Sequence, residues 1–349
     1  MTASLFKTKI AAAKIVCKTL IAAAVLLFSG CERQMAPQSE FVLGTVCSIN
    51  LYEDGSAELY GKLFARLREL NDIFNNYSDS SEISRVNREA AATPVPVSQD
   101  FYAVLKTALD FARLTGGAFD PTVGPLVKLW GFGKSPRVPS QEEIEAAQKL
   151  VGWQCVALQE SAVRFTKSGV RLDLGAIAKG YAADCLVDIL RERGVKRASL
   201  SLGGNIYVYG KKPGGSLWNV AIRDPSKPGQ NAFILKTRDA TVVTSGAYER
   251  FFEQDGKTYG HILDPATGFP AKSGLESVTI VSHNSMVADA LSTSLFVLGM
   301  EKIPEIKKSA LAGNFECVLV DASGKAYASK GLKGALSALN GQEIAFCDF

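Results

Sequence analysis

The sequence lacks both of the common phosphate-binding loops. It contains no G-x-x-x-x-G-K-[ST] loop, and no G-x-G-x-x-G follows a strand-like run. This absence argues against a P-loop NTPase and against a dinucleotide-binding domain of the Rossmann type. A phosphate-bearing ligand of this protein would need a different cradle.

Histidine is scarce and cysteine is scattered. There are two histidines and seven cysteines, and no C-x-x-C pair occurs. Once Cys17 and Cys31 of the N-terminal segment are set aside, five cysteines remain at wide spacings. This pattern argues against a zinc site and against a disulfide framework. We predict that most of these cysteines are small buried apolar residues.

The chain has little net charge outside its first segment. The formal net charge is +4, and residues 1–30 contain four lysines and no acidic residue. The rest of the chain is therefore neutral overall. Such a chain has no basic excess for binding nucleic acid.

No apolar run is long enough to cross a bilayer comfortably. The apolar run at residues 20–28 follows the four lysines and has the length of a signal-peptide core. Ser29, Gly30 and Cys31 follow it as in a lipobox, although Phe28 stands where an aliphatic residue is usual. We predict a lipoprotein signal peptide at 1–30, lipidation of Cys31, a tether at 31–40 and a periplasm-facing membrane lipoprotein. The alternatives are plain secretion and an uncleaved membrane anchor.

Helical and strand-like segments are mixed without strict alternation, which favours an α+β fold over a doubly wound parallel sheet. Residues 41–52 are rich in apolar and β-branched residues and predict a strand. Ser140 and Glu143 have capping-box spacing, which predicts a helix start. The other predicted helices span 56–76, 98–115, 177–193, 286–298 and 301–311, and the one at 140 ends by 152. Further strands are predicted at 155–158, 163–166, 170–172, 199–202, 206–209, 218–222, 241–244, 277–281 and 316–320.

Two glycine-containing segments are candidates for ligand binding. TGGAFDPTVGPLVKLWGFG (115–133) contains Asp120, and its glycines permit close backbone approach to a ligand. LDLGAIAKGYAAD (172–184) carries Asp173 at a strand end and Lys179 at the start of a helix. The N-H groups of a helix N-terminus, together with a lysine, suit a phosphate. The alternatives are an irregular surface loop and an ordinary strand-turn-helix with a solvated lysine.

Two further segments carry possible catalytic groups. His261 stands in YGHILDPATG, and a histidine near neutrality suits a general base. Asp289 and Thr293 are four residues apart in VADALSTSLFVL, so both project from one helix face. A carboxylate and a hydroxyl form half of a Mg²⁺ site. A structural histidine, an aspartate near a helix N-terminus and a threonine bonded to its own backbone are the alternatives.

Taken together, these motifs resemble the FAD:protein FMN transferase (ApbE) family over residues 41–299. The resemblance includes LGT (43–45), YSDSSEISRVN (77–87), GAFDPTVGPL, LDLGAIAKGYAAD, SLGGNIYVYG, IRDP, TSGAYER, HILDPATG and ADALSTSLFVLG. Many members have Met where this chain has Leu43, and an apolar contact survives that exchange. The resemblance implies an α+β, T-fold-like enzyme of mixed sheets with flanking helices, with a catalytic domain at 41–349.

The resemblance also implies roles for individual residues. Mg²⁺ would be bound by the backbone oxygen of Ala176 and the side chains of Asp289 and Thr293. His261 and Asp289 would take catalytic roles, including acceptance of a proton. The residues implied to contact FAD are Leu43, Tyr77, Ala118, Phe119, Asp120, Asp173, Lys179 and Ile262.

The implied reaction is the Mg²⁺-dependent transfer of FMN from FAD to a Thr or Ser hydroxyl of an acceptor flavoprotein, with release of AMP. The resemblance implies acceptors with a D-x-x-[ST]-[GSA]-A-T motif, such as subunits of Rnf-type or sodium-translocating quinone-reductase complexes. The alternatives are an FAD pyrophosphatase, a non-catalytic flavin-binding lipoprotein and an exported phosphate-ester hydrolase unrelated to flavin. Tyr77 favours transfer by analogy, and the Asp289/Thr293 pair disfavours pure binding.

Overall fold

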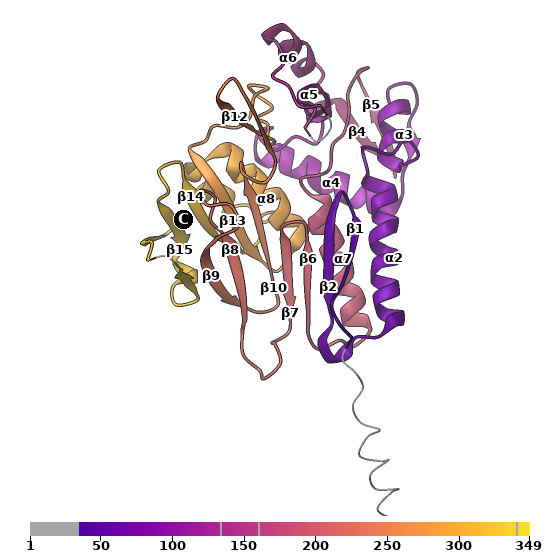
Figure 1. Ribbon diagram of the computed structural model, residues 1–349. Helices are drawn as coiled ribbons and strands as arrows, with labels where there is room; N and C mark the ends of the chain where they lie inside the picture. Colours follow the sequence, from indigo (N-terminus) through magenta and orange to yellow (C-terminus); the bar gives the residue numbers. More distant parts are fainter. Residues whose placement is uncertain (1–34, 133–134, 160, 340) are drawn as a thin grey trace, which may run out of the picture.

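The structure, a computed structural model, describes residues 35–132, 135–159, 161–339 and 341–349 (Figure 1). The predicted signal peptide and Cys31 lie outside these residues. No helix in the described part of the chain is long and apolar enough to span a membrane.

A nine-stranded sheet forms the centre of the fold. Neighbouring strands are antiparallel except the last pair, which is parallel, so the sheet is mixed. In spatial order its strands are β1 (Gln38–Val42), β2 (Thr45–Asn50), β6 (Ala198–Leu202), β7 (Asn205–Tyr209), β10 (Ala240–Gly246), β13 (Leu275–Ser282), β14 (Glu316–Asp321), β15 (Ala326–Ser329) and β17 (Ile344–Cys347).

The single strand predicted at residues 41–52 is wrong in its bounds, because this part of the chain forms parts of two strands. Residues 41–52 form the end of β1, a tight turn and β2, and β1 begins at Gln38 inside the predicted tether. Leu43 and Gly44 both have positive φ, at 56° and 69°. Such φ values match a two-residue hairpin turn, which a pattern of apolar residues alone does not reveal.

Helices cover one face of the large sheet, and small sheets and loops complete the molecule. The helices are α2 (Ala57–Phe74), α3 (Glu82–Glu89), α4 (Gln99–Leu114), α5 (Gly124–Trp130), α6 (Gln141–Gln148), α7 (Ala178–Glu192), α8 (Ser285–Leu298) and α9 (Ile303–Ile306). The 3-10 turns are η1 (Tyr52–Asp54), η2 (Trp153–Cys155), η3 (Met300–Lys302) and η4 (Lys330–Leu332). The small sheets are β16-β9-β8 (Leu336–Ala338, Asn231–Thr237, Trp218–Arg223), β3-β5-β4 (Val95–Pro96, Ala162–Phe165, Val156–Gln159) and β11-β12 (Phe251–Gln254, Lys257–Gly260).

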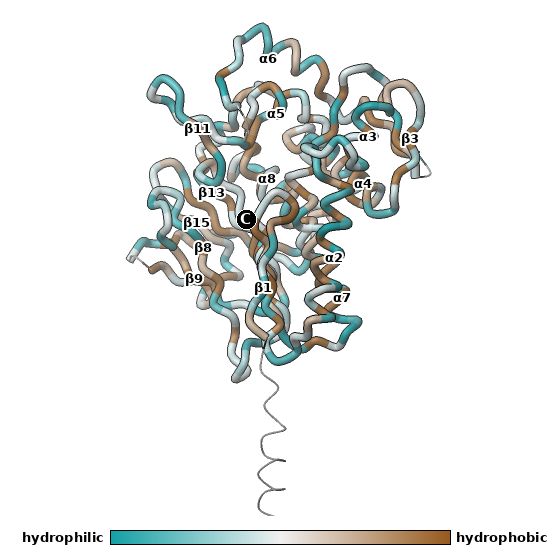
Figure 2. The backbone as a smooth tube through the Cα atoms, turned by 45° about the vertical axis from the view of Figure 1, so that its right-hand side comes forward, coloured by the Kyte–Doolittle hydropathy of each residue, from teal (hydrophilic) through white to brown (hydrophobic). Residues whose placement is uncertain are grey.

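The main core lies between the sheet and α2, α4, α7 and α8. Leu63, Leu67 and Leu70 of α2 are fully buried in it, as the helical spacing predicts. Figure 2 shows the corresponding alternation of hydrophobic and hydrophilic residues along α2 and α7. A second core lies on the opposite face, where β8, β9 and β16 pack on the large sheet.

The glycine-rich segment at 115–132 is not an irregular surface loop, which was the alternative to a ligand-binding segment. It contains α5, whose Trp130 is fully buried and donates an Nε1-H···O bond of 2.8 Å to Gly268. Nearby, the predicted strand at 170–172 is only an isolated bridge between Arg171 and Val123. The apolar residues of both segments are buried against other parts of the chain, and such tertiary packing is not visible in a local pattern.

The α+β prediction is confirmed, and most helix starts are correct. Ser56, Ser98 and Ser140 cap α2, α4 and α6, with the predicted capping box at Ser140. The predicted helix at 301–311 is mostly wrong, because only η3 and the four-residue α9 form there. The strands β3, β9, β11, β12, β15, β16 and β17 and the helices α3 and α5 were not predicted.

The packing of α7 on α8 gives a first prediction. A methyl group on Gly180 would lie 2.2 Å from the carbonyl oxygen of Ser285. Gly180→Ala should therefore lower the free energy of unfolding by about 1–3 kcal/mol. Gly61 of α2 has no such neighbour within 4 Å, so Gly61→Ala should be neutral or slightly stabilising. Chemical denaturation of both variants tests this, and equal effects would contradict it.

Candidate active site

One cavity of about 300 Å³ gathers all the residues that the sequence placed in a site. It lies where the β1-β2 turn, the C-terminal end of α2, the start of α7 and the middle of α8 meet. The residues in question are Leu43, Tyr77, Ala118, Phe119, Asp120, Asp173, Ala176, Lys179, His261, Ile262, Asp289 and Thr293. Their individual roles stay predictions.

A contact between α7 and α8 positions two charged residues of the cavity, Asp289 and Lys179. Asp289 is 4 % exposed, and its Oδ2 accepts a hydrogen bond of 2.9 Å from the Gly180 backbone N-H. Lys179 Nζ lies 3.8 Å from the same oxygen and donates a 2.9 Å bond to the Gly175 carbonyl. A buried carboxylate needs such partners, because desolvation penalises its charge.

The start of α8 is also held from α7. The carboxylate of Asp184 accepts backbone N-H bonds from Ser285 at 2.9 Å and Met286 at 2.8 Å. Burial raises the pKa of Asp184 to about 6, although these two bonds oppose the shift. The bonds to Asp184 and the bond between Gly180 and Asp289 together fix the orientation of α8, and with it the positions of Asp289 and Thr293.

The oxygen atoms around Asp289 suit a magnesium ion. Thr293 lies one helical turn further on, and its Oγ1 is 3.3 Å from Ser245 Oγ of β10. Ala176 precedes α7 and also lines the cavity, and its backbone carbonyl is a third hard oxygen. No cluster of three His, Cys, Asp or Glu residues able to hold a metal occurs among the described residues. A single carboxylate with neutral oxygens fits Mg²⁺, which keeps several positions for water or substrate phosphates.

Two aspartates stabilise the loops that border the cavity. Asp173 accepts the Gly175 N-H at 2.9 Å, and burial raises its pKa. Asp120 uses both carboxylate oxygens within the protein. Its Oδ1 accepts from the N-H and hydroxyl of Thr122 at 2.8 and 2.6 Å, and its Oδ2 accepts from the Trp153 N-H at 3.0 Å. Asp120 therefore links its own turn to the start of η2, while the Thr115 hydroxyl accepts the Phe119 N-H at 3.0 Å.

The environment of His261 keeps its imidazole neutral. Its Nδ1 lies 3.1 Å from the carbonyl oxygen of Arg250. Because a carbonyl only accepts hydrogen bonds, Nδ1 carries the proton, which leaves a lone pair on Nε2. Burial, followed by the positive charges of Arg250 and Lys179, lowers the pKa of His261 to about 4. A neutral imidazole at the cavity can accept a proton at pH 7.

Several polar residues of the cavity wall were not predicted from the sequence, among them Glu249, Arg250 and Asn205. Burial raises the pKa of Glu249, while the charges of Lys179 and Arg223 oppose that shift. Asn205 is 2 % exposed, and its Nδ2 has no hydrogen-bond partner within the described part of the chain. The motifs TSGAYER and SLGGN contain these residues, but only the pairing of β7 with β10 brings them to the cavity.

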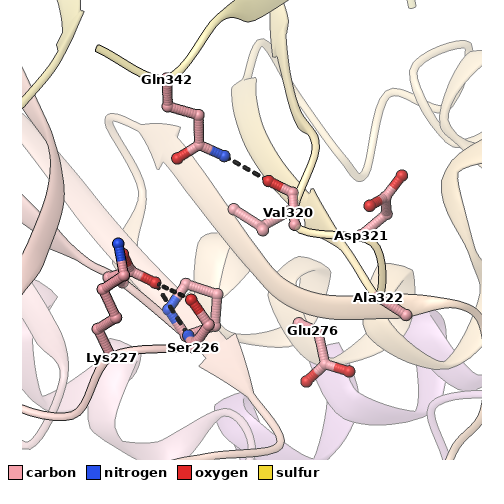
Figure 3. A pocket seen from close by; sticks show the side chains of 10 residues that line it. Ser226, Lys227, Glu276, Val320, Asp321, Ala322 and Gln342 are labelled. Atoms are coloured by element: carbon pink, nitrogen blue, oxygen red, sulfur yellow. Dashed lines mark hydrogen bonds and ion pairs between the residues drawn. The ribbon is translucent and has the colours of Figure 1, made fainter. Parts of the chain in front are cut away.

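A second cavity of about 510 Å³ contains none of the predicted residues (Figure 3). Asp224, Lys227, Glu276 and Asp321 line it. Asp224 Oδ1 and Asp321 Oδ1 accept backbone and hydroxyl bonds from the serine two residues further on, at 2.6–2.9 Å. These carboxylates stabilise local turns, so the smaller cavity is the better candidate for catalysis.

The chain is similar to known proteins both in structure and in sequence. The chain has an α+β fold, and its structure is similar to those of flavin transferases. The ApbE family profile matches residues 43–319, and the chain belongs to the ApbE family. This is a family of enzymes.

Two curated relatives illustrate the similarity. An FAD:protein FMN transferase of Treponema pallidum is 41% identical over 286 residues, which is 76% of this chain and 79% of the relative. An FAD:protein FMN transferase of Vibrio cholerae is 34% identical over 325 residues, which is 90% of this chain and 97% of the relative.

Solved structures agree in fold. The flavin transferase ApbE from Vibrio cholerae matches with a TM-score of 0.76 at 32% identity, over 86% of this chain and 98% of the other. The ApbE protein from Thermotoga maritima matches with a TM-score of 0.76 at 34% identity, over 86% of this chain and 99% of the other.

The bonding of Asp120 gives a prediction of its own. In Asp120→Asn the new NH₂ group must face one of the donors on Thr122 or Trp153. The variant should lose about 1–3 kcal/mol of unfolding free energy, because a buried donor then lacks an acceptor. Asp79 is exposed, so Asp79→Asn is the matched control and should change stability little. Urea denaturation with equal midpoints for the two variants would refute this assignment.

Proposed function

We propose that this protein is a FAD:protein FMN transferase that moves FMN from FAD to a Thr or Ser hydroxyl of an acceptor flavoprotein and releases AMP. The observation that carries the proposal is the cavity itself. Its lining includes three residues with oxygen atoms that could bind a metal, a lysine and a histidine whose imidazole is neutral at pH 7: Ala176, Asp289, Thr293, Lys179 and His261. This combination suits phosphoryl transfer, which depends mainly on positioning and charge stabilisation.

The residues of the α7-α8 junction would hold Mg²⁺. The ligands would be the carbonyl of Ala176, the carboxylate of Asp289 and the hydroxyl of Thr293. The ion would supply positive charge to the pyrophosphate of FAD and to the leaving AMP. Lys179, which already lies 3.8 Å from Asp289, adds a second positive charge at the same place.

Other residues would position the two substrates. Leu43, Phe119 and Ile262 provide apolar contacts, and Tyr77 offers an aromatic ring to the flavin. The acceptor hydroxyl would attack the FMN phosphorus while its proton moves to Nε2 of His261. The bond between that phosphorus and the AMP oxygen then breaks, and AMP leaves with the electron pair.

The export signal and the acceptor form part of the same proposal. The chain would carry a signal peptide at 1–30, a lipid on Cys31, a short tether and a catalytic domain reaching residue 349. It would act on the periplasmic side of a membrane, on proteins with a D-x-x-[ST]-[GSA]-A-T motif. Subunits of Rnf-type or sodium-translocating quinone-reductase complexes are suitable candidates.

A reconstituted reaction tests this function. The chain from residue 35 is mixed with FAD, Mg²⁺ and a protein bearing the acceptor motif, with and without EDTA. Mass spectrometry should find FMN on the acceptor Thr and free AMP, both dependent on the metal. Free FMN and AMP with an unmodified acceptor would favour the pyrophosphatase, whereas bound but intact FAD would favour a flavin carrier.

The metal assignment predicts the effect of a charge removal at Asp289. Asp289→Asn keeps an oxygen for the Gly180 N-H but removes the negative charge. Transfer should fall by at least about a hundredfold, and more Mg²⁺ should be needed for half-maximal rate. Asp188 on α7 is a matched control, because its side chain is 68 % exposed on an outer face. An unchanged Mg²⁺ dependence in Asp289→Asn would rule out this ligand.

The role of His261 predicts a pH profile. Since its pKa is lowered to about 4, the base stays neutral down to that pH. The acid limb of kcat/KM should therefore lie near pH 4 and not near the ordinary 6.5 of histidine. His261→Gln should lower kcat by about 10²–10⁴-fold with little change in the KM for FAD. His283→Gln, which changes the other histidine, should leave the rate unchanged. A fully active His261→Gln enzyme would eliminate the histidine base.

A further inference from the structure

Most of the exposed large apolar side chains lie on, or next in sequence to, the segments that line the cavity. Among the described residues, six large apolar side chains are exposed. Four of them line the cavity or stand within two residues of its lining: Phe41 at 76 %, Val46 at 57 %, Tyr77 at 61 % and Phe251 at 51 %. The remaining two, Leu217 and Leu339, lie in segments that do not line it.

Phe41 and Val46 face each other across the β1-β2 hairpin. They are directly paired in register, and their neighbours Val42 and Cys47 point into the core. Since side chains alternate along a strand, Phe41 and Val46 lie on the outer face of the hairpin. The turn that joins these strands, Leu43 and Gly44, lines the cavity. Phe41 and Val46 therefore lie within two residues of the cavity lining.

Phe251 borders the mouth from another direction. It begins β11 and follows Arg250, which lines the cavity. Arg250 Nη2 donates a hydrogen bond of 3.3 Å to the Gly44 carbonyl, so β11 adjoins the tip of the β1-β2 hairpin. Phe41, Val46 and Phe251 together are called the apolar rim below.

Among the described residues, no element covers the face of the hairpin that carries Phe41 and Val46. The core under β8, β9 and β16 is formed by residues of β7, β10, β13, β14 and β15, with none from β1 or β2. Ser201 of β6, the next strand along, is exposed as well. Apolar side chains left open beside a reaction cavity indicate a surface for a partner.

We propose that the apolar rim binds the polypeptide of the acceptor protein on either side of the hydroxyl that receives FMN. The inference rests on the proposed function. In the proposed reaction FAD occupies the cavity, so only the residue that bears the hydroxyl and its immediate neighbours would enter it. The acceptor residues on either side of that hydroxyl would therefore contact the protein surface around the mouth of the cavity. The apolar rim forms part of this surface. Burial of Phe41 and Phe251 against the acceptor would add to the affinity for the acceptor and leave the affinity for FAD unchanged.

The test separates binding of the acceptor from binding of FAD. The double variant Phe41→Ser/Val46→Ser and the single variant Phe251→Ser remove the rim, and Leu217→Ser/Leu339→Ser removes equally exposed apolar groups elsewhere. The probe is a purified protein bearing the D-x-x-[ST]-[GSA]-A-T motif. Its Kd is measured by biolayer interferometry, and the KM values for acceptor and for FAD are measured by FMN transfer. Thermal melting confirms that each variant is folded.

Both rim variants should raise the Kd and the KM for the acceptor at least tenfold, with the KM for FAD unchanged. The control variant should match the wild type. Equal acceptor affinity in wild-type and rim variants would overturn the proposal, as would a parallel rise in the KM for FAD. If the wild type transfers no FMN, the proposed function fails, and the acceptor Kd values alone still decide whether the rim binds this protein.

Discussion

The hydrogen bond from the Gly180 backbone to the carboxylate of Asp289 is the contact on which the site depends. It requires α7 and α8 to approach so closely that position 180 has no room for a side chain. The same approach places Lys179 beside Asp289 and lets Asp184 cap the start of α8. A buried negative charge, a nearby cation and a fixed helix direction thus follow from one packing constraint.

The rest of the cavity is assembled around this junction by the nine-stranded sheet. The sheet brings the β1-β2 turn and the end of β10 to the same place, although two hundred residues separate them. Arg250, which directly precedes β11, lines the cavity as well, and its carbonyl sets the tautomer of His261. In the proposed reaction, the α7-α8 junction would bind the phosphates of FAD, His261 would accept the proton of the incoming hydroxyl, and the apolar rim would hold the acceptor polypeptide.

The sequence predicted those parts of the fold that local rules determine. Serine caps located α2, α4 and α6, and the spacing of Asp289 and Thr293 placed both on one helix face. The turn at Leu43, helix α5 and the edge strands were missed, because they depend on backbone conformation or on distant packing. The resemblance to a family supplied the site residues that single motifs left ambiguous. Glu249, Arg250 and Asn205 were overlooked, since only strand pairing brings them to the cavity.

The proposed metal site is tested most directly by locating a metal in crystals. Crystals grown with FAD and with Mn²⁺ in place of Mg²⁺ would give an anomalous difference map, because Mn²⁺ accepts the same oxygen ligands. The account predicts a peak bounded by the Ala176 carbonyl, the Asp289 carboxylate and the Thr293 hydroxyl. A map with no peak there, or with one only among Asp224, Glu276 and Asp321, would contradict it.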